Sequence, residues 1–402
     1  MTCKNITTNT QPLIESIDKL FWRFLVGKNQ IHKEEEYNDG LSEADADNNS
    51  LNPVLKEESG WGQRILLDVE KQRVERVKVE QRLKDKRNAL LMRYFQQSLL
   101  KAVNEKLENS DDIINNQLQF RETTCDLLIT LLAGEPRYSI LASLLDLDSG
   151  TRNRLLSLVG CSNFMGKLGR EPRDVRDIHS AVGMVGIDVL RFLVPAILFK
   201  YRINSYSPHN TLFTKKLWRY ELTLGQTCTA LMYQENYRRP YEGLLLSVMI
   251  NSAFVASYKQ YSASFEIVRT ACLDNARDKG EKAQHDVFFD IQTDVASLQA
   301  LLMSHANLKL SLTLSEKTFG RDFPHLVNAL AEQVNNVPFA ERSKVGKILF
   351  KAVRFAKYDQ LRASRLFNKQ WLADYLRDSQ IDAATYKKLV HQELFRFKPI
   401  WP

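Results

Sequence analysis

Apolar residues recur every three or four positions along most of this chain, which is the spacing of one face of an α-helix. The first such segment, residues 12–27, predicts a short amphipathic helix whose apolar face is formed by Leu13, Ile17, Leu20, Phe21, Phe24 and Leu25. Residues 65–107 predict a long helix that is charged nearly all round in its first half and amphipathic in its second half. Further helices are predicted at about 111–133, 138–146, 150–160, 186–202, 212–236, 239–257, 261–278 and 284–306.

The composition supports an all-α fold. The 402 residues include only 16 Gly and 11 Pro, and no Asn-Gly hairpin signal separates the apolar runs. The five cysteines are scattered without a CxxC pair, which is typical of small buried side chains in a reducing cytoplasm. No apolar run reaches about 18 residues, so no membrane span is expected. The polar first residues also argue against a secretory signal.

Charge is unevenly distributed along the chain. Residues 1–60 hold 6 Lys/Arg and 11 Asp/Glu, a net charge of −5, so the remainder carries +8 − (−5) = +13. Residues 28–60 are too polar to form a core and are expected to be a disordered acidic linker. The helix before this linker either docks into a partner through Leu13, Ile17, Phe21 and Phe24 or folds back onto its own domain. The basic remainder either binds an anionic partner or keeps the protein soluble.

Several segments resemble HDOD domains, the non-catalytic relatives of the HD-type metal-dependent phosphohydrolases. Leu141–Gly160 is similar to the first helices of that family, and Ile178–Arg191 is similar to its stretch leading into a long apolar helix. Phe319–Val327 is similar to its aromatic-glycine pair before a proline-started helix. The resemblance covers roughly residues 120–360. It departs from the family at residues 160–162, where Gly-Cys-Ser replaces the usual Asn-Ser-Ala.

The resemblance also indicates which positions would hold metal in a catalytic relative. Tyr220 stands where such a relative has histidine, and Ile250-Asn251 stands where it has His-Asp. Isoleucine cannot bind a metal, and asparagine offers only a neutral carbonyl. The resemblance therefore implies a non-catalytic regulatory protein of a bacterial cytoplasm, without metal or cofactor, acting through protein contacts. An active phosphohydrolase with displaced ligands and a nucleic-acid-binding regulator are the alternatives.

Other metal or nucleophile motifs are weak. His285-Asp286 lies at the start of an amphipathic segment without an apolar lead-in, and Asp286, Asp290 and Asp294 are spaced to line one face of a helix. Like charges at that spacing usually mark a solvated face. The histidines show no HxxxH spacing, and the chain contains no Walker loop, GxGxxG or GxSxG motif.

The last predicted helix carries a basic stripe formed by Lys344, Lys347, Lys351 and Arg354. Such a stripe either contacts phosphates or an acidic protein surface, or is the solvated outer face of a packed helix. The sequence thus predicts an amphipathic helix (1–27), an acidic disordered linker (28–60), a long charged helix (61–110), an HDOD-like helical domain (111–336) and a basic helical extension packed on it (337–402). It does not identify the partner or the oligomeric state.

Overall fold

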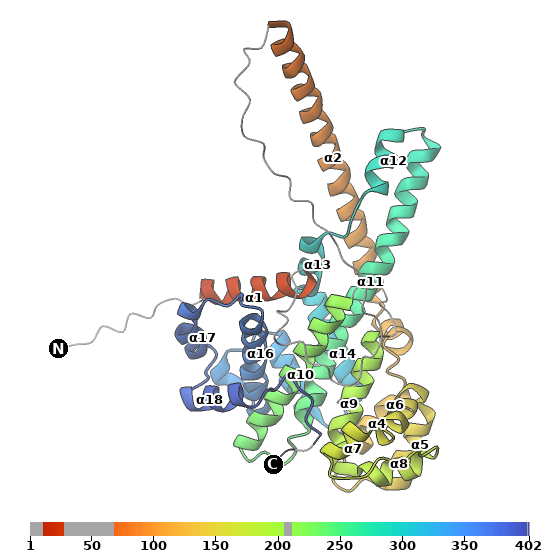
Figure 1. The fold of residues 1–402 in the computed structure, drawn as a ribbon, viewed down its shortest axis with the longest axis vertical. Coiled ribbons are helices and arrows are strands. Elements are labelled where there is room, and N and C mark those ends of the chain that lie inside the picture. Colours follow the sequence, from red (N-terminus) through yellow and green to blue (C-terminus); the bar gives the residue numbers. More distant parts are fainter. Residues whose placement is uncertain (1–10, 28–67, 205–210, 400, 402) are drawn as a thin grey trace, which may run out of the picture. The chain divides into compact units, whose positions relative to one another are not determined.

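The computed structural model describes residues 11–27, 68–204, 211–399 and 401. In these residues the chain forms helices joined by turns and short loops, with no strand among them, so the predicted all-α fold is confirmed (Figure 1). The predicted linker at 28–60 lies outside the described residues, as does the first part of the segment predicted as a long helix.

The helices begin and end as follows. The first half of the chain contains α1 (Gln11–Val26), α2 (Asp68–Glu108), α3 (Ser110–Asp112), the π-helix η2 (Ile113–Gln117), α4 (Glu122–Leu132), α5 (Tyr138–Leu147), α6 (Ser149–Val159), α7 (Ser162–Lys167), α8 (Ile178–Val185) and α9 (Ile187–Asn204). The second half contains α10 (Thr211–Gln234), α11 (Glu242–Asp278), α12 (Lys282–Phe289), α13 (Val295–Leu302), α14 (His305–Phe319), α15 (Pro324–Val334), η3 (Phe339–Glu341), α16 (Lys344–Ala363), η4 (Lys369–Trp371), α17 (Leu372–Asp378) and α18 (Ala383–His391).

The chain divides into two compact units. The first contains the described residues of 11–27 together with 100–264 and 293–402, and the second contains 68–99 and 265–292. The second unit has a small aromatic core in which the ring of Phe95 lies 5.3 Å from Phe265 and 6.4 Å from Phe288. The sequence-based boundary between 336 and 337 does not separate these units, because residues 337–402 belong to the same unit as 111–264.

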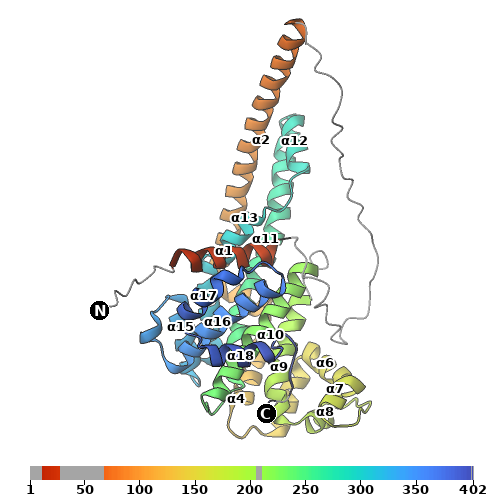
Figure 2. The same cartoon turned by 60° about the vertical axis from the view of Figure 1, so that its left-hand side comes forward.

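The centre of the first unit is formed by α10, which packs against α16, and by the start of α11 (Figures 1 and 2). Glycines allow α10 and α11 to approach closely. A Cβ atom on Gly225 would lie 2.6 Å from the Ser247 Oγ, and one on Gly243 would lie 2.6 Å from the Thr229 backbone nitrogen. Any larger side chain at either glycine would force these two helices apart.

Helices α4 to α9 form a second group in the same unit, with α5 packed on α4, α6 and α8 (Figure 1). Aspartates begin two of them. Asp148 accepts a hydrogen bond from the Thr151 amide at 3.0 Å at the start of α6, and Asp177 accepts one from Ser180 at 2.8 Å at the start of α8. Within the described part of the chain no single helix is long and apolar enough to cross a membrane; α8 and α9 reach that length only as a pair bent by 113°.

Two predicted boundaries in the second half of the chain were wrong. The segments 239–257 and 261–278 form one continuous 37-residue helix, α11. The segment 284–306 is not one helix, because Asp294 caps the start of α13 by accepting hydrogen bonds from the amides of Ala296 and Ser297. Asp290 follows the end of α12. The carboxylates of Asp286, Asp290 and Asp294 therefore do not line one helical face.

Candidate functional site

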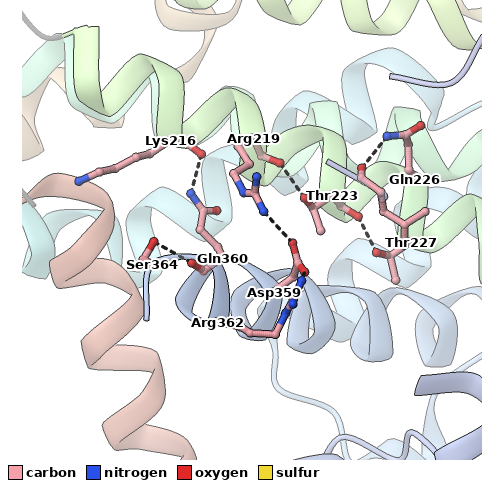
Figure 3. Close-up of polar contacts among 10 residues, drawn as sticks. Lys216, Arg219, Thr223, Gln226, Thr227, Asp359, Gln360, Arg362 and Ser364 are labelled. Atoms are coloured by element: carbon pink, nitrogen blue, oxygen red, sulfur yellow. Dashed lines mark hydrogen bonds and ion pairs between the residues drawn. The ribbon is translucent and has the colours of Figure 1, made fainter. Parts of the chain in front are cut away.

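The α10 helix carries polar side chains that are buried in the centre of the first unit. They are Lys216, Arg219, Glu221, Thr223, Gln226, Thr227 and Thr229. A buried polar group is costly unless it is hydrogen-bonded, so the partners of these residues decide what α10 holds in place. Figure 3 shows several of these contacts, which join α10 to α16 and to the carboxyl-terminal segment.

The three positions predicted to have lost metal ligands lie in this core. Tyr220, Ile250 and Asn251 are all buried, with Asn251 wholly excluded from solvent. The Asn251 amide nitrogen donates a hydrogen bond to the Glu221 Oε2 at 2.5 Å. Tyr220 instead contacts α1, with its ring 4.8 Å from that of Phe21. Tyr220 and Asn251 therefore face different partners and do not line one site.

Glu221 is the centre of a small buried network that the sequence analysis missed. Its Oε1 accepts a hydrogen bond from the Ser247 hydroxyl at 2.6 Å, while Asn251 donates to its other oxygen. Burial raises the pKa of Glu221 to about 8, against the opposing effect of the hydrogen bonds from Asn251 and Ser247. The carboxyl group therefore holds a proton at neutral pH, and a protonated carboxyl is a poor ligand for a hard cation.

The histidines that the structure describes do not assemble into a metal site. In the part of the chain that the structure describes, no three His, Cys, Asp or Glu side chains gather closely enough to hold a metal ion. The imidazole of His285 lies 3.8 Å from the Asp286 carboxylate, and both side chains are exposed. His209 and the side chain of His305 lie outside the described residues.

A second buried carboxylate belongs to Glu242, at the start of α11. Its Oε2 lies 2.9 Å from the His325 Nε2 and accepts a hydrogen bond from the Tyr237 hydroxyl at 3.1 Å. The Arg239 guanidinium lies 3.7 Å from the other oxygen. These contacts join α11 to α15 and to the turn after α10. The pairing of Glu242 with His325 was not recognised from the sequence, because the two residues are 83 positions apart.

Both α1 and the segment 394–398 are hydrogen-bonded to side chains of α10. Lys216 donates from its ammonium to the carbonyls of Phe24 at 2.7 Å and Gly27 at 2.8 Å, and so caps the end of α1. Its burial lowers the pKa of Lys216 to about 8. Further along α10, Gln226 donates to the Leu394 and Arg396 carbonyls and accepts from the Lys398 amide at 2.9 Å.

The predicted docking helix is thus part of the folded domain. Ile17 and Phe21 are fully buried, Phe24 is 2% exposed, and Leu13 is half-buried at the edge. The Trp22 ring packs on Phe254 at 4.6 Å. Of the two sequence-based alternatives, the structure shows the helix folded back on its own domain. Its apolar face finds partners on α10, α11, α13 and α16.

Helix α16 is joined to α10 by a buried ion pair. The Arg219 guanidinium lies 3.2 Å from the Asp359 carboxylate, and both side chains are less than a tenth exposed. The other oxygen of Asp359 accepts from Arg362 at 2.8 Å, and Gln360 donates to the Lys216 carbonyl at 2.9 Å (Figure 3). α16 therefore packs on α10 through buried polar contacts as well as apolar ones.

The four members of the predicted basic stripe on α16 each lie near another group of the same chain. Lys344 lies 3.7 Å from the Glu235 carboxylate, and Arg354 is 17% exposed between Asp18 and Asp378, each 3.9 Å away. The ammonium groups of the other two members, Lys347 and Lys351, each lie 5.8 Å from the centre of the Phe339 ring. The four residues do share a helix, as predicted, but they do not form one exposed cationic surface.

Replacing Arg354 by glutamate should lower the free energy of unfolding by about 2–3 kcal/mol, because it would bring a third carboxylate beside Asp18 and Asp378. Lys344→Glu is the matched control, since the Lys344 side chain is 54% exposed and such charges change stability by less than about 0.5 kcal/mol. Urea titrations of the two variants measure the difference. Equal effects would show that the ion pairs of Arg354 stabilise the fold no more than the exposed ion pair of Lys344 does.

No family model, curated protein or solved structure matches this chain. Its function is therefore inferred from its own residues.

Proposed function

We propose that this chain is a non-catalytic, HDOD-like regulatory protein of a bacterial cytoplasm that acts through contacts with other proteins. The observation that carries this proposal is that no anionic ligand is available beside Asn251. The neighbouring Glu221 is protonated, and its two oxygens are hydrogen-bonded to Asn251 and Ser247, so it cannot bind a metal without breaking these bonds. The Asn251 Oδ1 is buried without a hydrogen-bond partner, but it is a single neutral oxygen, whereas a hard cation needs several oxygen ligands.

Tyr220 supports the same proposal. In a phosphohydrolase of the HD type this position would supply an imidazole, whereas here a phenol packs against Phe21 of α1. Burial raises the pKa of Tyr220 well above its ordinary value, so the phenol stays neutral and offers no anionic ligand.

A nucleic-acid-binding function through α16 receives little support, because two of its four predicted cations are already close to carboxylates of the same chain. A charge that is neutralised internally releases no counterions when a phosphate approaches. Contacts with proteins therefore remain the function that the described residues favour.

We expect the purified full-length protein to contain no stoichiometric transition metal and to release no product from a phosphodiester or a cyclic dinucleotide in Mn²⁺ or Mg²⁺. Elemental analysis and an activity assay test this, with Asn251→Ala assayed in parallel. Turnover that disappears both on chelation and in Asn251→Ala would overturn the proposal and establish the phosphohydrolase alternative. Turnover that is lost on chelation but unchanged in Asn251→Ala would also overturn the proposal, because it would indicate a phosphohydrolase whose metal ligands lie elsewhere.

A further inference from the structure

The second unit carries a row of exposed apolar side chains on α2. Val79 is 44% exposed, Leu83 61%, Leu90 64% and Tyr94 57%. They are separated by four, seven and four positions, so they lie on one face of the helix. We call these four residues the α2 stripe. They form two pairs, Val79 with Leu83 and Leu90 with Tyr94, on either side of a turn that carries Lys86 and Arg87. Exposed apolar residues are unremarkable when scattered singly, but several grouped on one helical face are typical of an interaction surface.

The other side of α2 is already packed. Phe95 is 2% exposed and contacts the rings of Phe265 and Phe288 in the second unit. Because α2 has 3.6 residues per turn, Phe95 lies roughly 130° around the helix from the centre of the α2 stripe. The helix thus has two apolar faces, one of which its own unit covers. The other carries two apolar pairs at i,i+4 spacing, which lie next to each other on the helix surface and can contact one face of a second helix.

Cations border the α2 stripe. Arg76, Lys86, Arg87 and Arg93 are exposed, and in the part of the chain that the structure describes none of them forms an ion pair. This is the opposite of the stripe on α16, where Arg354 faces two carboxylates. Two exposed acids, Glu75 and Glu80, lie beside Arg76 and Val79, so the charge around the α2 stripe is predominantly, not wholly, positive. The α2 stripe therefore combines apolar area with a net positive charge that is available to a partner.

We infer that the α2 stripe is the docking surface for an amphipathic helix of another protein, whose apolar face is bordered by Asp and Glu. This inference rests on the proposed function and names the surface that would serve it. The apolar residues would pack against the partner's apolar face, and the bordering guanidinium and ammonium groups would pair with its carboxylates.

Charge complementarity selects this partner over the other occupants. A second copy of the chain would place the same cations opposite these ones, and like charges across a helical interface oppose pairing. A nucleic acid would engage the cations through its phosphates and leave Leu83 and Leu90 in water, so it would not account for the apolar residues. An anionic membrane would bind both the apolar residues and the cations. The test therefore compares anionic vesicles with a helical peptide.

The test uses the full-length protein and a fluorescently labelled designed peptide of roughly 28 residues, with leucine at the heptad a and d positions and glutamate at e and g. Fluorescence anisotropy measures the dissociation constant. A peptide with lysine at e and g is the charge control. Anionic phospholipid vesicles and duplex DNA are titrated separately.

Two paired variants examine the two components of the surface. Leu83→Ala with Leu90→Ala removes apolar area, and Arg87→Glu with Arg93→Glu reverses the bordering charge. We expect each pair to weaken binding of the acidic peptide about tenfold or more, and the basic peptide to bind wild type at least about tenfold more weakly than the acidic one.

The matched control is Lys78→Glu with Lys84→Glu, which reverses two exposed charges of α2 away from the stripe. This pair should change binding by less than about threefold, and all variants should keep the wild-type helical signal because the substituted positions are exposed. The inference is overturned if wild type does not bind the acidic peptide, if the control pair weakens binding as much as the stripe variants, or if vesicles or DNA bind more tightly. The absence of metal-dependent turnover is measured on the same preparation, so failure of this inference is distinguishable from failure of the proposed function.

Discussion

Above pH 8, a Glu221→Gln variant should be more stable than the wild-type protein, whereas at pH 5 the two should have similar stability. The folded protein holds the Glu221 proton up to a pKa of about 8, while an unfolded glutamate releases it near its model value of 4.5. The folded state thus binds more protons between these two values, so the free energy of unfolding falls as pH rises through this window. The contribution is present below pH 4.5 and is lost by pH 8, and its size is on the order of 5 kcal/mol.

Glutamine abolishes this dependence because it does not ionise and can still accept hydrogen bonds from Ser247 and Asn251. Urea unfolding of both proteins at several pH values between 5 and 9 gives the difference in stability, in which the titration of all other groups cancels. Glu266→Gln is the matched control, since the Glu266 side chain is 63% exposed. If the free energies of unfolding of Glu221→Gln and wild type change in parallel with pH, Glu221 is ionised in the folded protein. The buried network with a protonated Glu221 would then be wrong.

The helical periodicity was sufficient to predict most of this fold. The apolar face of residues 12–27 predicted α1, and the charged first half of residues 65–107 predicted the exposed part of α2. Both signals are local, because they depend only on residues within a few turns of each other. The breaks in the second half were harder to predict, since Asp294 looked like one member of an acidic face and instead caps α13.

The buried polar residues of α10 could not be predicted in the same way. Lys216 and Glu221 occupy positions that normally mark a solvated face, and each is satisfied by groups that the local sequence does not reveal. Lys216 is satisfied by carbonyls near residue 24, and Glu221 by side chains of α11. The local sequence offered only four charges in the first half of α10, Lys215, Lys216, Arg219 and Glu221, which do not by themselves show whether they are buried.

The basic stripe on α16 and the α2 stripe show the same limit of prediction from local sequence. The spacing of Lys344 to Arg354 on one helix was predicted correctly, but the partner of Arg354 was not, because Asp18 comes from the other end of the chain. On α2, the sequence predicted an amphipathic second half, yet only the structure shows that Leu83 and Leu90 are exposed while Phe95 is buried. Periodicity identifies the faces of a helix but does not say which of them another element covers.

Replacing Phe21 by alanine should lower the free energy of unfolding by about 3–5 kcal/mol, because a fully buried ring is lost and a cavity remains beside Tyr220. The loss should be concentrated at α1, with faster hydrogen exchange of its amides, because Phe21 is one of the main contacts of that helix with α10. Urea titration measures the stability, and hydrogen exchange locates the change.

Lys19→Ala is the matched control, since the Lys19 side chain is exposed on the same helix. It should change stability by less than about 0.5 kcal/mol. Lys216→Met separates packing from capping, because it removes the ammonium that binds the Phe24 and Gly27 carbonyls and leaves Phe21 in place. If Phe21→Ala changes stability no more than Lys19→Ala, α1 does not stay on the domain in solution. The alternative that the structure disfavours, a free docking helix presenting Ile17, Phe21 and Phe24 to a partner, would then be the correct one.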